Sequence, residues 1–186
     1  MNFKKTSGII LLLFIFIGGV AGGYLYFSRI VAQEKAAPEI IPGIPKNEML
    51  LSLRIYYPVG GQLQMEERRP PKKTGSTAIA EATVEEYLRG AAVTSISLMP
   101  KNARLLGIYR GTDGILYVDL SEEFRRNFQG DVFGEFLLLK GLYESLISNV
   151  QDIQDVKILI EGKEVETLGG HLMLMYPLKD MVSHEQ

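Results

Sequence analysis

The stretch Val156-Lys-Ile-Leu-Ile-Glu-Gly-Lys-Glu-Val-Glu-Thr-Leu-Gly-Gly-His171 is the most informative part of this 186-residue chain. Its apolar residues are typical of a strand over 156–160, and a second short strand is predicted over 164–167. Between them, Glu161-Gly162-Lys163 has the composition of a tight turn, and Gly169-Gly170 ends the second strand. The stretch therefore predicts a short hairpin near the C-terminus.

Upstream of this stretch, strand patterns and helix patterns alternate. Alternating polarity with β-branched and aromatic residues predicts strands, and apolar residues three and four positions apart predict helices. We expect strands over 50–57, 62–69, 104–109, 115–120, 156–160, 164–167 and 172–176, a turn at 58–61, and helices from Ser76 or Thr77 to about Arg89 and from Asp131 to Asn149. The order ββα-ββα-ββ predicts an α+β domain with two helices on one face of a mixed or antiparallel sheet.

The N-terminal segment 9–27 contains no charged residue and is long enough, at about 1.5 Å per residue, to cross a bilayer as a helix. Lys4 and Lys5 precede it, which predicts that residues 1–8 lie in the cytoplasm. We expect a single-pass signal anchor in the cytoplasmic (inner) membrane, with the rest of the chain in the periplasm or extracytoplasmic space. A signal peptide cleaved after Gly19-Val20-Ala21 is the alternative.

Prolines and small residues make residues 28–46 a predicted linker, followed by a domain over 47–180 and a tail over 181–186. From residue 47 onward the chain has 15 Lys and Arg against 20 Asp and Glu. The resulting charge of −5 argues against a nucleic-acid partner. The chain has no cysteine, which excludes a lipidated cysteine, disulfides and thiol chemistry.

Three parts of the sequence carry a family resemblance. They are 51–58 (LSLRIYYP), then 100–108 (PKNARLLGI) with 114–124 (GILYVDLSEEF), and finally 156–171. Together they resemble the GerMN domain, the sporulation and spore germination module of bacterial envelope proteins. The resemblance implies a compact domain similar to ring-building modules, preceded here by one transmembrane helix. It also implies a position outside the cytoplasmic membrane and a role in assembling an envelope complex.

No set of residues predicts catalysis. Lys73-Thr74-Gly75 matches a triplet of penicillin-binding enzymes, but no serine in the chain has a lysine three residues later. The two histidines, His171 and His184, have no cluster of Asp and Glu at metal-ligand spacing. Asp119 is expected to cap the turn over 121–124 rather than to act as an acid or base. We therefore expect no enzymatic activity, no metal and no cofactor.

Two sets of residues are candidates for binding. Arg68, Arg69, Lys72 and Lys73, together with His171, are predicted to dock a partner protein or an anionic wall polymer. For the four cations, a solvated segment that protects a sheet edge is the favoured interpretation, and for His171 a structural role in the turn is favoured. Within the anchor, Gly18 with Gly22 and Gly19 with Gly23 form two Gly-xxx-Gly spacings, which favour dimerisation of membrane helices.

The sequence thus predicts a non-enzymatic, membrane-anchored module that assembles or scaffolds an envelope complex. Its expected partners are the membrane, envelope proteins and a second copy of the chain, contacted through a helix face and a sheet face. The alternative is binding of peptidoglycan or another glycan, which is disfavoured because the chain has no tryptophan and most tyrosines fall in strand or helix patterns. A hydrolase is least favoured, since no nucleophile is paired with a base.

Overall fold

The computed structural model describes residue 23 and residues 50–92 and 98–183. The chain divides into two units, Met1–Lys46 and Asn47–Gln186, and all named strands belong to the second. Within the described residues, none of the helices combines the length and the apolar character needed to cross a membrane. The expected anchor over 9–27 lies outside the described residues apart from Gly23, which is helical, and the expected linker over 28–46 lies outside them as well.

The first two strands form a sheet of their own. β1 (Leu53–Val59) pairs antiparallel with β2 (Gln62–Arg68) through a turn made only of Gly60 and Gly61. Their φ angles of 60° and 80° are left-handed, which is the conformation of two-residue hairpin turns and the reason for glycine at both positions. The observed turn is therefore shorter than the turn predicted over 58–61, because Pro58 and Val59 still belong to β1. A proline is tolerated there because β1 is an edge strand.

The other three strands form a mixed sheet in the order β3-β4-β5. β3 (Leu105–Arg110) is antiparallel to β4 (Ile115–Leu120), and β5 (Asp155–Ile160) is parallel to β4. The prediction of a mixed sheet is confirmed, but the prediction of one sheet is wrong because there are two. The reason lies at the free edge of β1, where the Tyr56 N–H donates to Ser145 Oγ, 2.9 Å away on a helix, and not to another strand.

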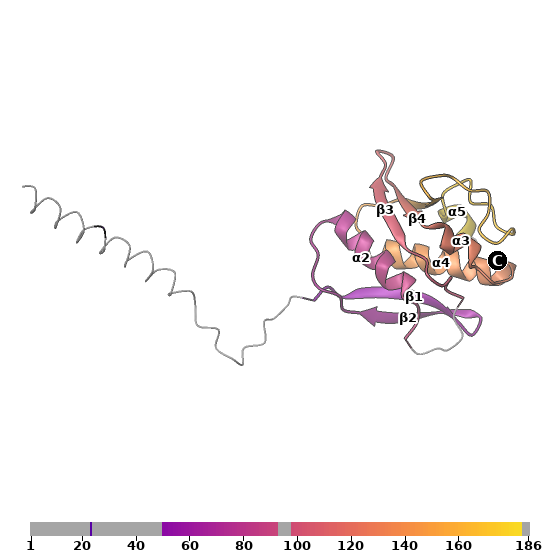
Figure 1. Ribbon diagram of the computed structural model, residues 1–186, viewed down its shortest axis with the longest axis horizontal. Helices are drawn as coiled ribbons and strands as arrows, with labels where there is room; N and C mark the ends of the chain where they lie inside the picture. Colours follow the sequence, from indigo (N-terminus) through magenta and orange to yellow (C-terminus); the bar gives the residue numbers. More distant parts are fainter. Residues whose placement is uncertain (1–22, 24–49, 93–97, 184–186) are drawn as a thin grey trace, which may run out of the picture. The chain divides into compact units, whose positions relative to one another are not determined.

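The two long helices lie where the sequence predicts them. α2 (Ser76–Leu88) and α4 (Val132–Asn149) cover the inner face of the three-stranded sheet, and α4 also contacts the β1–β2 hairpin (Figure 1). Asp131 caps α4 as expected, accepting a hydrogen bond from the Gly134 N–H at 2.8 Å. The N-cap of α2 is Gly75 without a side-chain hydrogen bond, so the expected cap at Ser76 or Thr77 is wrong. Two short helices, α3 (Glu122–Arg126) and α5 (Lys179–Ser183), complete the domain.

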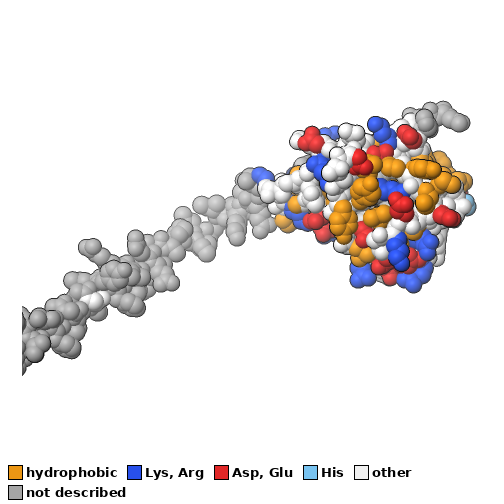
Figure 2. Space-filling model, turned by 90° about the horizontal axis from the view of Figure 1, so that it is seen from above, with side chains coloured by type: hydrophobic (Ala, Val, Ile, Leu, Met, Phe, Trp, Pro, Cys, Tyr) orange, Lys and Arg blue, Asp and Glu red, His pale blue; other side chains and the backbone are white. Residues whose placement is uncertain are grey.

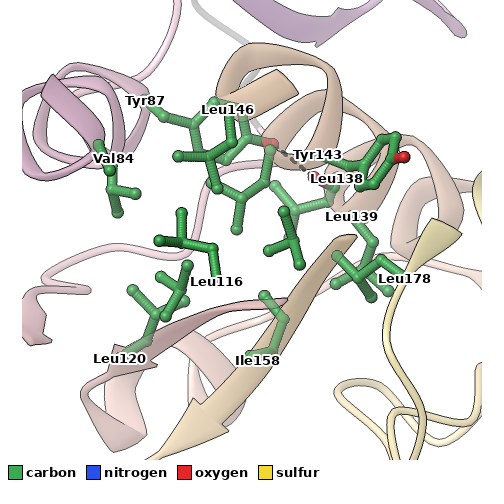
Figure 3. Packing of buried hydrophobic residues seen from close by; sticks show 14 of the residues in the cluster. Val84, Tyr87, Leu116, Leu120, Leu138, Leu139, Tyr143, Leu146, Ile158 and Leu178 are labelled. Atoms are coloured by element: carbon green, nitrogen blue, oxygen red, sulfur yellow. Dashed lines mark hydrogen bonds between the residues drawn. The ribbon is translucent and has the colours of Figure 1, made fainter. Parts of the chain in front are cut away.

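One hydrophobic core fills the space between the helices and the inner face of the three-stranded sheet (Figure 3). Within it, the fully buried Tyr87 of α2 donates from its hydroxyl to the Leu138 carbonyl oxygen of α4 at 2.6 Å. This bond satisfies a polar group that would otherwise be costly to bury. Most of the remaining core is aliphatic and comes from both layers, including Leu116, Val118 and Leu120 of β4, Ile158 of β5, and Leu139, Leu142 and Leu146 of α4.

The chain after β5 turns back but forms no second strand. Ile160 and Lys163 exchange two backbone hydrogen bonds of 2.8 and 3.0 Å across Glu161 and Gly162, which confirms the tight turn. No strand is assigned to residues 164–178, so the strands expected over 164–167 and 172–176 are wrong. The outer edge of β5 is occupied differently, because the Leu178 N–H donates to the Val156 carbonyl oxygen at 2.8 Å.

The packed domain extends into the predicted tail. α5 (Lys179–Ser183) follows Leu178 directly, and its Val182 side chain is buried. Val182 N–H donates to the Leu178 carbonyl oxygen at 3.0 Å. The C-terminal residues up to 183 therefore belong to the core-bearing unit.

Candidate interaction face

The outer face of the three-stranded sheet carries a row of side chains that point away from the core. Since Leu116, Val118 and Leu120 point inward and are buried, the alternate residues of β4 point outward. On that outer face, Tyr109 of β3 pairs with Tyr117 of β4, which in turn pairs with Lys157 of β5. The register thus places two tyrosines and one lysine side by side across all three strands.

Glycines allow the two tyrosine rings to lie close to the backbone. A β-carbon added at Gly107 would lie 2.7 Å from the Tyr109 hydroxyl oxygen and 2.9 Å from Cζ. A β-carbon at Gly111 would lie 3.1 Å from Cε2 of Tyr117. The rings therefore occupy space that any larger residue would take. Tyr109 nevertheless remains 56% exposed, so much of its ring is open to solvent.

The C-terminal loop adds further apolar side chains beside this row. Lys157, only 2% exposed, donates from its ammonium group to the Met175 carbonyl oxygen, and Glu164 lies 3.4 Å from the same ammonium. This contact fixes the loop next to β5 and neutralises the lysine. Met173 and Tyr176 of the loop are 63% and 70% exposed, and Met175 is also exposed.

We call Tyr109, Tyr117, Met173, Met175 and Tyr176 the tyrosine–methionine face. Seen from the side of β3, β4 and the C-terminal loop, hydrophobic side chains gather on this part of the domain (Figure 2). Tyrosine and methionine are enriched in the centres of protein interfaces, where charged residues are depleted. Exposed apolar patches of this kind mark sites of protein or membrane contact. The composition therefore fits a docking surface better than it fits a solvated sheet face.

A buried carboxylate holds the first part of the same loop. Glu135, in the first turn of α4, has no solvent exposure. Its Oε1 accepts from the N–H groups of Leu168 and Gly169 at 3.1 and 2.9 Å, and its Oε2 accepts from that of His171 at 3.2 Å. The path of the loop here requires glycine at two positions. A β-carbon at Gly169 would lie 2.6 Å from the Phe128 ring, and Gly170 has a left-handed φ of 92°.

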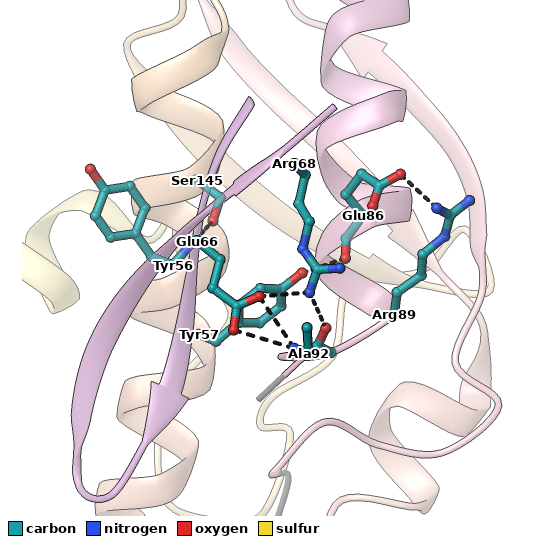
Figure 4. A network of polar contacts seen from close by, with 9 residues as sticks. Tyr56, Tyr57, Glu66, Arg68, Glu86, Arg89, Ala92 and Ser145 are labelled. Atoms are coloured by element: carbon teal, nitrogen blue, oxygen red, sulfur yellow. Dashed lines mark hydrogen bonds and ion pairs between the residues drawn. The ribbon is translucent and has the colours of Figure 1, made fainter. Parts of the chain in front are cut away.

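Arg68, one of the predicted docking cations at the end of β2, is engaged within the protein (Figure 4). Arg68 lies 5.4 Å over the Tyr57 ring, and its Nη2 donates to Glu66 and to the Gly90 carbonyl oxygen, both at 2.8 Å. Glu66 also accepts from the Ala92 N–H at 3.2 Å. Arg68 therefore ties β2 to the end of α2, although its buried Nε has no partner among the described residues.

The remaining members of the predicted docking set are placed as follows. Arg69 donates to Glu67 at 3.1 Å, and Lys73 lies 3.4 Å from Glu85. These pairs support the interpretation of a solvated, self-neutralised segment around Lys72, and docking through it stays a prediction. His171 is exposed and lies by α4, where its backbone N–H reaches Glu135. Within the described ranges 50–92 and 98–183, no contact joins His171 to the cations.

Gly18, Gly19 and Gly22 lie outside the described residues, so dimerisation through the anchor stays a prediction. Gly23 alone is described, and it is exposed. Asp119 is structural as expected, but its partner differs from the prediction: Oδ1 accepts from the Gly162 N–H at 2.7 Å and caps the turn after β5. Over the described residues, no group of three His, Asp or Glu side chains is arranged to hold a metal ion.

Sequence reasoning missed the tyrosine–methionine face. Tyr109 and Tyr117 were treated as strand residues, yet the alternation of 115–120 already implies that Tyr117 points away from Leu116 and Val118. Met173, Met175 and Tyr176 could not have been found in this way, because the strand expected there does not exist. The contact between Lys157 and Met175 helps to bring them to the same face.

This arrangement is that of an α+β domain of the GerMN type. Residues 54–166 match the Germane family, described as sporulation and spore germination. The chain belongs to this family, and the resemblance drawn from its sequence is confirmed.

Solved structures show the same fold at low sequence identity. A Clostridium perfringens protein provisionally described as a lipoprotein has 19% identity over 72% of this chain and 91% of that one, with a TM-score of 0.50. The tandem GerMN domains of the sporulation protein GerM from Bacillus subtilis have 20% identity over 70% of this chain, which spans 47% of theirs, with a TM-score of 0.54. The structure of the first of these domains alone has 19% identity over 68% of this chain and 94% of that one, with a TM-score of 0.51. No curated protein sequence matches the chain significantly.

Proposed function

We propose that this chain is a non-enzymatic assembly module of a bacterial envelope complex of the sporulation and germination type. It docks through the tyrosine–methionine face. The observation that carries the proposal is the exposure of large apolar side chains on that face, where Tyr109, Met173 and Tyr176 are each more than half exposed. Family membership supports the setting, since the Germane family is described by sporulation and spore germination.

The proposal includes a tether at the cytoplasmic membrane. The uncharged segment 9–27 follows Lys4 and Lys5, so the N-terminus would remain in the cytoplasm and the domain would lie outside. The likeness to a protein described as a lipoprotein supports an envelope location. Because this chain has no cysteine to be lipidated, the helix itself would hold it.

We further propose that one copy docks on another. Val132 and Phe133, at the start of α4, are both 52% exposed. Phe133 lies beside the β1–β2 turn, because a β-carbon at Gly61 would be 3.9 Å from its ring. This second apolar site differs from the tyrosine–methionine face, so a contact between the two would be heterologous and could close into a ring.

The absence of cysteine makes the test direct. Two tagged copies of the full-length chain, one with Tyr176→Cys and the other with Phe133→Cys, are produced together and treated with a bismaleimide in intact cells. We expect an adduct that carries both tags. Met65→Cys, on the exposed side of β2, is the matched control and should give none. Equal adducts from Met65→Cys, or no adduct from Tyr176→Cys, would contradict self-assembly through these surfaces.

The same variants test the location of the domain. A maleimide that cannot cross the cytoplasmic membrane should label Met65→Cys in intact cells. Labelling that requires broken cells would place the domain in the cytoplasm and contradict the tether as proposed. This result is independent of whether copies associate, so the two parts of the proposal can fail separately.

A further inference from the structure

A hollow of about 320 Å³ lies between two loops that are distant in the sequence. One loop precedes β3 and the other follows α3. The lining consists of Leu98, Met99, Lys101, Asn102, Asn127 and Gln129. None of these residues belongs to the tyrosine–methionine face. The volume falls at the lower end of the roughly 300–1,000 Å³ typical of small-molecule sites, so it suits a ligand of about one sugar ring.

The two loops are joined and held in place by an amide group. Asn127 Nδ2 donates to the Lys101 carbonyl oxygen at 2.8 Å, which orients the Asn127 carboxamide at the rim. Asn102 has a φ of 63°, a left-handed conformation that asparagine tolerates better than most residues. Non-glycine residues in this conformation are uncommon overall, and those that occur cluster at functional sites. The loop before β3 is therefore shaped by specific residues.

The polar groups of the hollow are available for a ligand. Among the described residues, no hydrogen bond engages the carboxamides of Asn102 and Gln129, and both residues are exposed. Each carboxamide offers two N–H donors and one carbonyl acceptor. Lys101 adds a positive charge, and none of the described lining residues carries a carboxylate. Such a lining favours a neutral or anionic ligand with many hydroxyl or amide groups.

The hollow also has an apolar side. Leu98 and Met99 are half-buried, and Leu98 is packed near α4, since a β-carbon at Gly134 would lie 3.3 Å from its Cδ1. Methionine adapts its shape to small apolar groups. An acetamide methyl group beside hydroxyl groups would fit carboxamides on one side and these two side chains on the other.

We propose that this hollow binds an N-acetylated amino sugar. The proposal goes beyond assembly through the tyrosine–methionine face and does not depend on it. In it, the carboxamides of Asn102, Asn127 and Gln129 bind the hydroxyl and acetamide groups. Leu98 and Met99 contact the acetyl methyl group, and Lys101 lies where a carboxylate substituent of the sugar would be neutralised.

The test is calorimetric titration of the full-length chain, kept in a detergent without a sugar headgroup. The probes are chitotriose, which carries acetamide groups, and cellotriose, which does not. We expect saturable binding of chitotriose and at least about tenfold weaker binding of cellotriose, because the acetamide contacts would be lost. No binding of chitotriose, or equal binding of both sugars, would overturn the proposal.

Two variants locate the site without disturbing the fold. Asn102→Gly removes the carboxamide but keeps the left-handed backbone, and Gln129→Ala removes an exposed side chain. Each should weaken chitotriose binding by about tenfold, as expected when a hydrogen-bonding partner is lost. Gln64→Ala, which removes an exposed carboxamide from β2, should change nothing. Unchanged binding in both hollow variants, or equal weakening by Gln64→Ala, would place the sugar elsewhere and overturn the assignment.

Discussion

Asn149 of α4 forms two hydrogen bonds with the backbone of Arg54 in β1. Its Oδ1 accepts from the Arg54 N–H at 3.0 Å, and its Nδ2 donates to the Arg54 carbonyl oxygen at 2.7 Å. One turn earlier on the same helix, Ser145 accepts from Tyr56. The helix thus satisfies the strand edge that another strand would otherwise pair with. This arrangement keeps the β1–β2 hairpin separate from the three-stranded sheet.

The first prediction concerns this edge. Asn149→Ala should lower the free energy of unfolding by about 2 kcal/mol, because two backbone groups lose their partners. Asn149→Asp keeps the acceptor but loses the donor to Arg54, so its loss should be smaller. Urea unfolding of fragment 47–186, followed by tyrosine fluorescence, measures both. Equal stability of Asn149→Ala and the unchanged fragment would show that water replaces these bonds without cost.

The second prediction concerns the close approach of α4 to β1. A β-carbon at Gly141 would lie 2.5 Å from the Tyr56 carbonyl oxygen, which is backbone and cannot move aside. Gly141→Ala should therefore destabilise the domain by about 2 kcal/mol, in spite of the better helix propensity of alanine. Gly134 is the control in the same helix, since its nearest contacts are 3.3 Å away and are side-chain atoms. In thermal unfolding, the midpoint temperature of Gly134→Ala should be well above that of Gly141→Ala.

The third prediction concerns the carboxylate under the C-terminal loop. Glu135→Ala should cost about 2–3 kcal/mol, because three backbone N–H groups lose a charged acceptor. The loop over 164–178 should also become sensitive to proteases, and mass spectrometry of the fragments locates the cuts. Glu123→Ala removes a half-buried carboxylate of α3 and should leave the loop protected. Cleavage at the same rate in both variants would show that Glu135 does not hold the loop.

The fourth prediction concerns alkaline pH. Burial raises the pKa of Tyr57 to about 12, and burial also raises the pKa of Tyr87 well above its usual value. A pKa that is higher in the folded state means that stability is complete below the unfolded value near 10 and falls as pH rises towards 12. Stability of fragment 47–186 should therefore decline over that interval.

Tyr57→Phe should make this decline shallower, because one of the groups with a raised pKa no longer ionises. The substitution also removes the hydrogen bond to the Glu86 carbonyl oxygen, so stability at neutral pH should fall too. Tyr176→Phe is the control, since this side chain is 70% exposed. An identical slope for Tyr57→Phe and the unchanged fragment between pH 10 and 12 would assign the decline to other groups.

Local patterns in the sequence predicted most of the regular elements. The alternation over 115–120 placed β4, and the spacing of Leu139, Tyr143 and Leu146 placed α4, because each pattern reports the face that one element buries. Asp131 was recognised as a cap because a cap depends only on the residues next to it. These signals are short-ranged, and they do not require knowledge of the neighbouring element.

The errors arose where distant residues decide the outcome. Whether β1 joins the main sheet depends on Ser145 and Asn149, about 90 residues further along the chain. The loss of the expected strand over 164–167 depends likewise on Glu135, which draws the following amides onto α4. The candidate face follows the same rule: alternation along β3 and β4 predicts that Tyr109 and Tyr117 point outward, whereas Met173, Met175 and Tyr176 depend on the position of the loop.

The seating of Leu178 against Val156 leaves the three-stranded sheet with unequal sides. Leu178 occupies the outer edge of β5. At the opposite edge of the sheet, no backbone group among the described residues pairs with the outer side of β3. A sheet with a single open flank can add one neighbour but cannot pass the pairing on. Strand addition through the three-stranded sheet alone would therefore stop at a two-fold pair of copies. Growth beyond two copies through this sheet would have to use side-chain surfaces, which limits β-aggregation through β3.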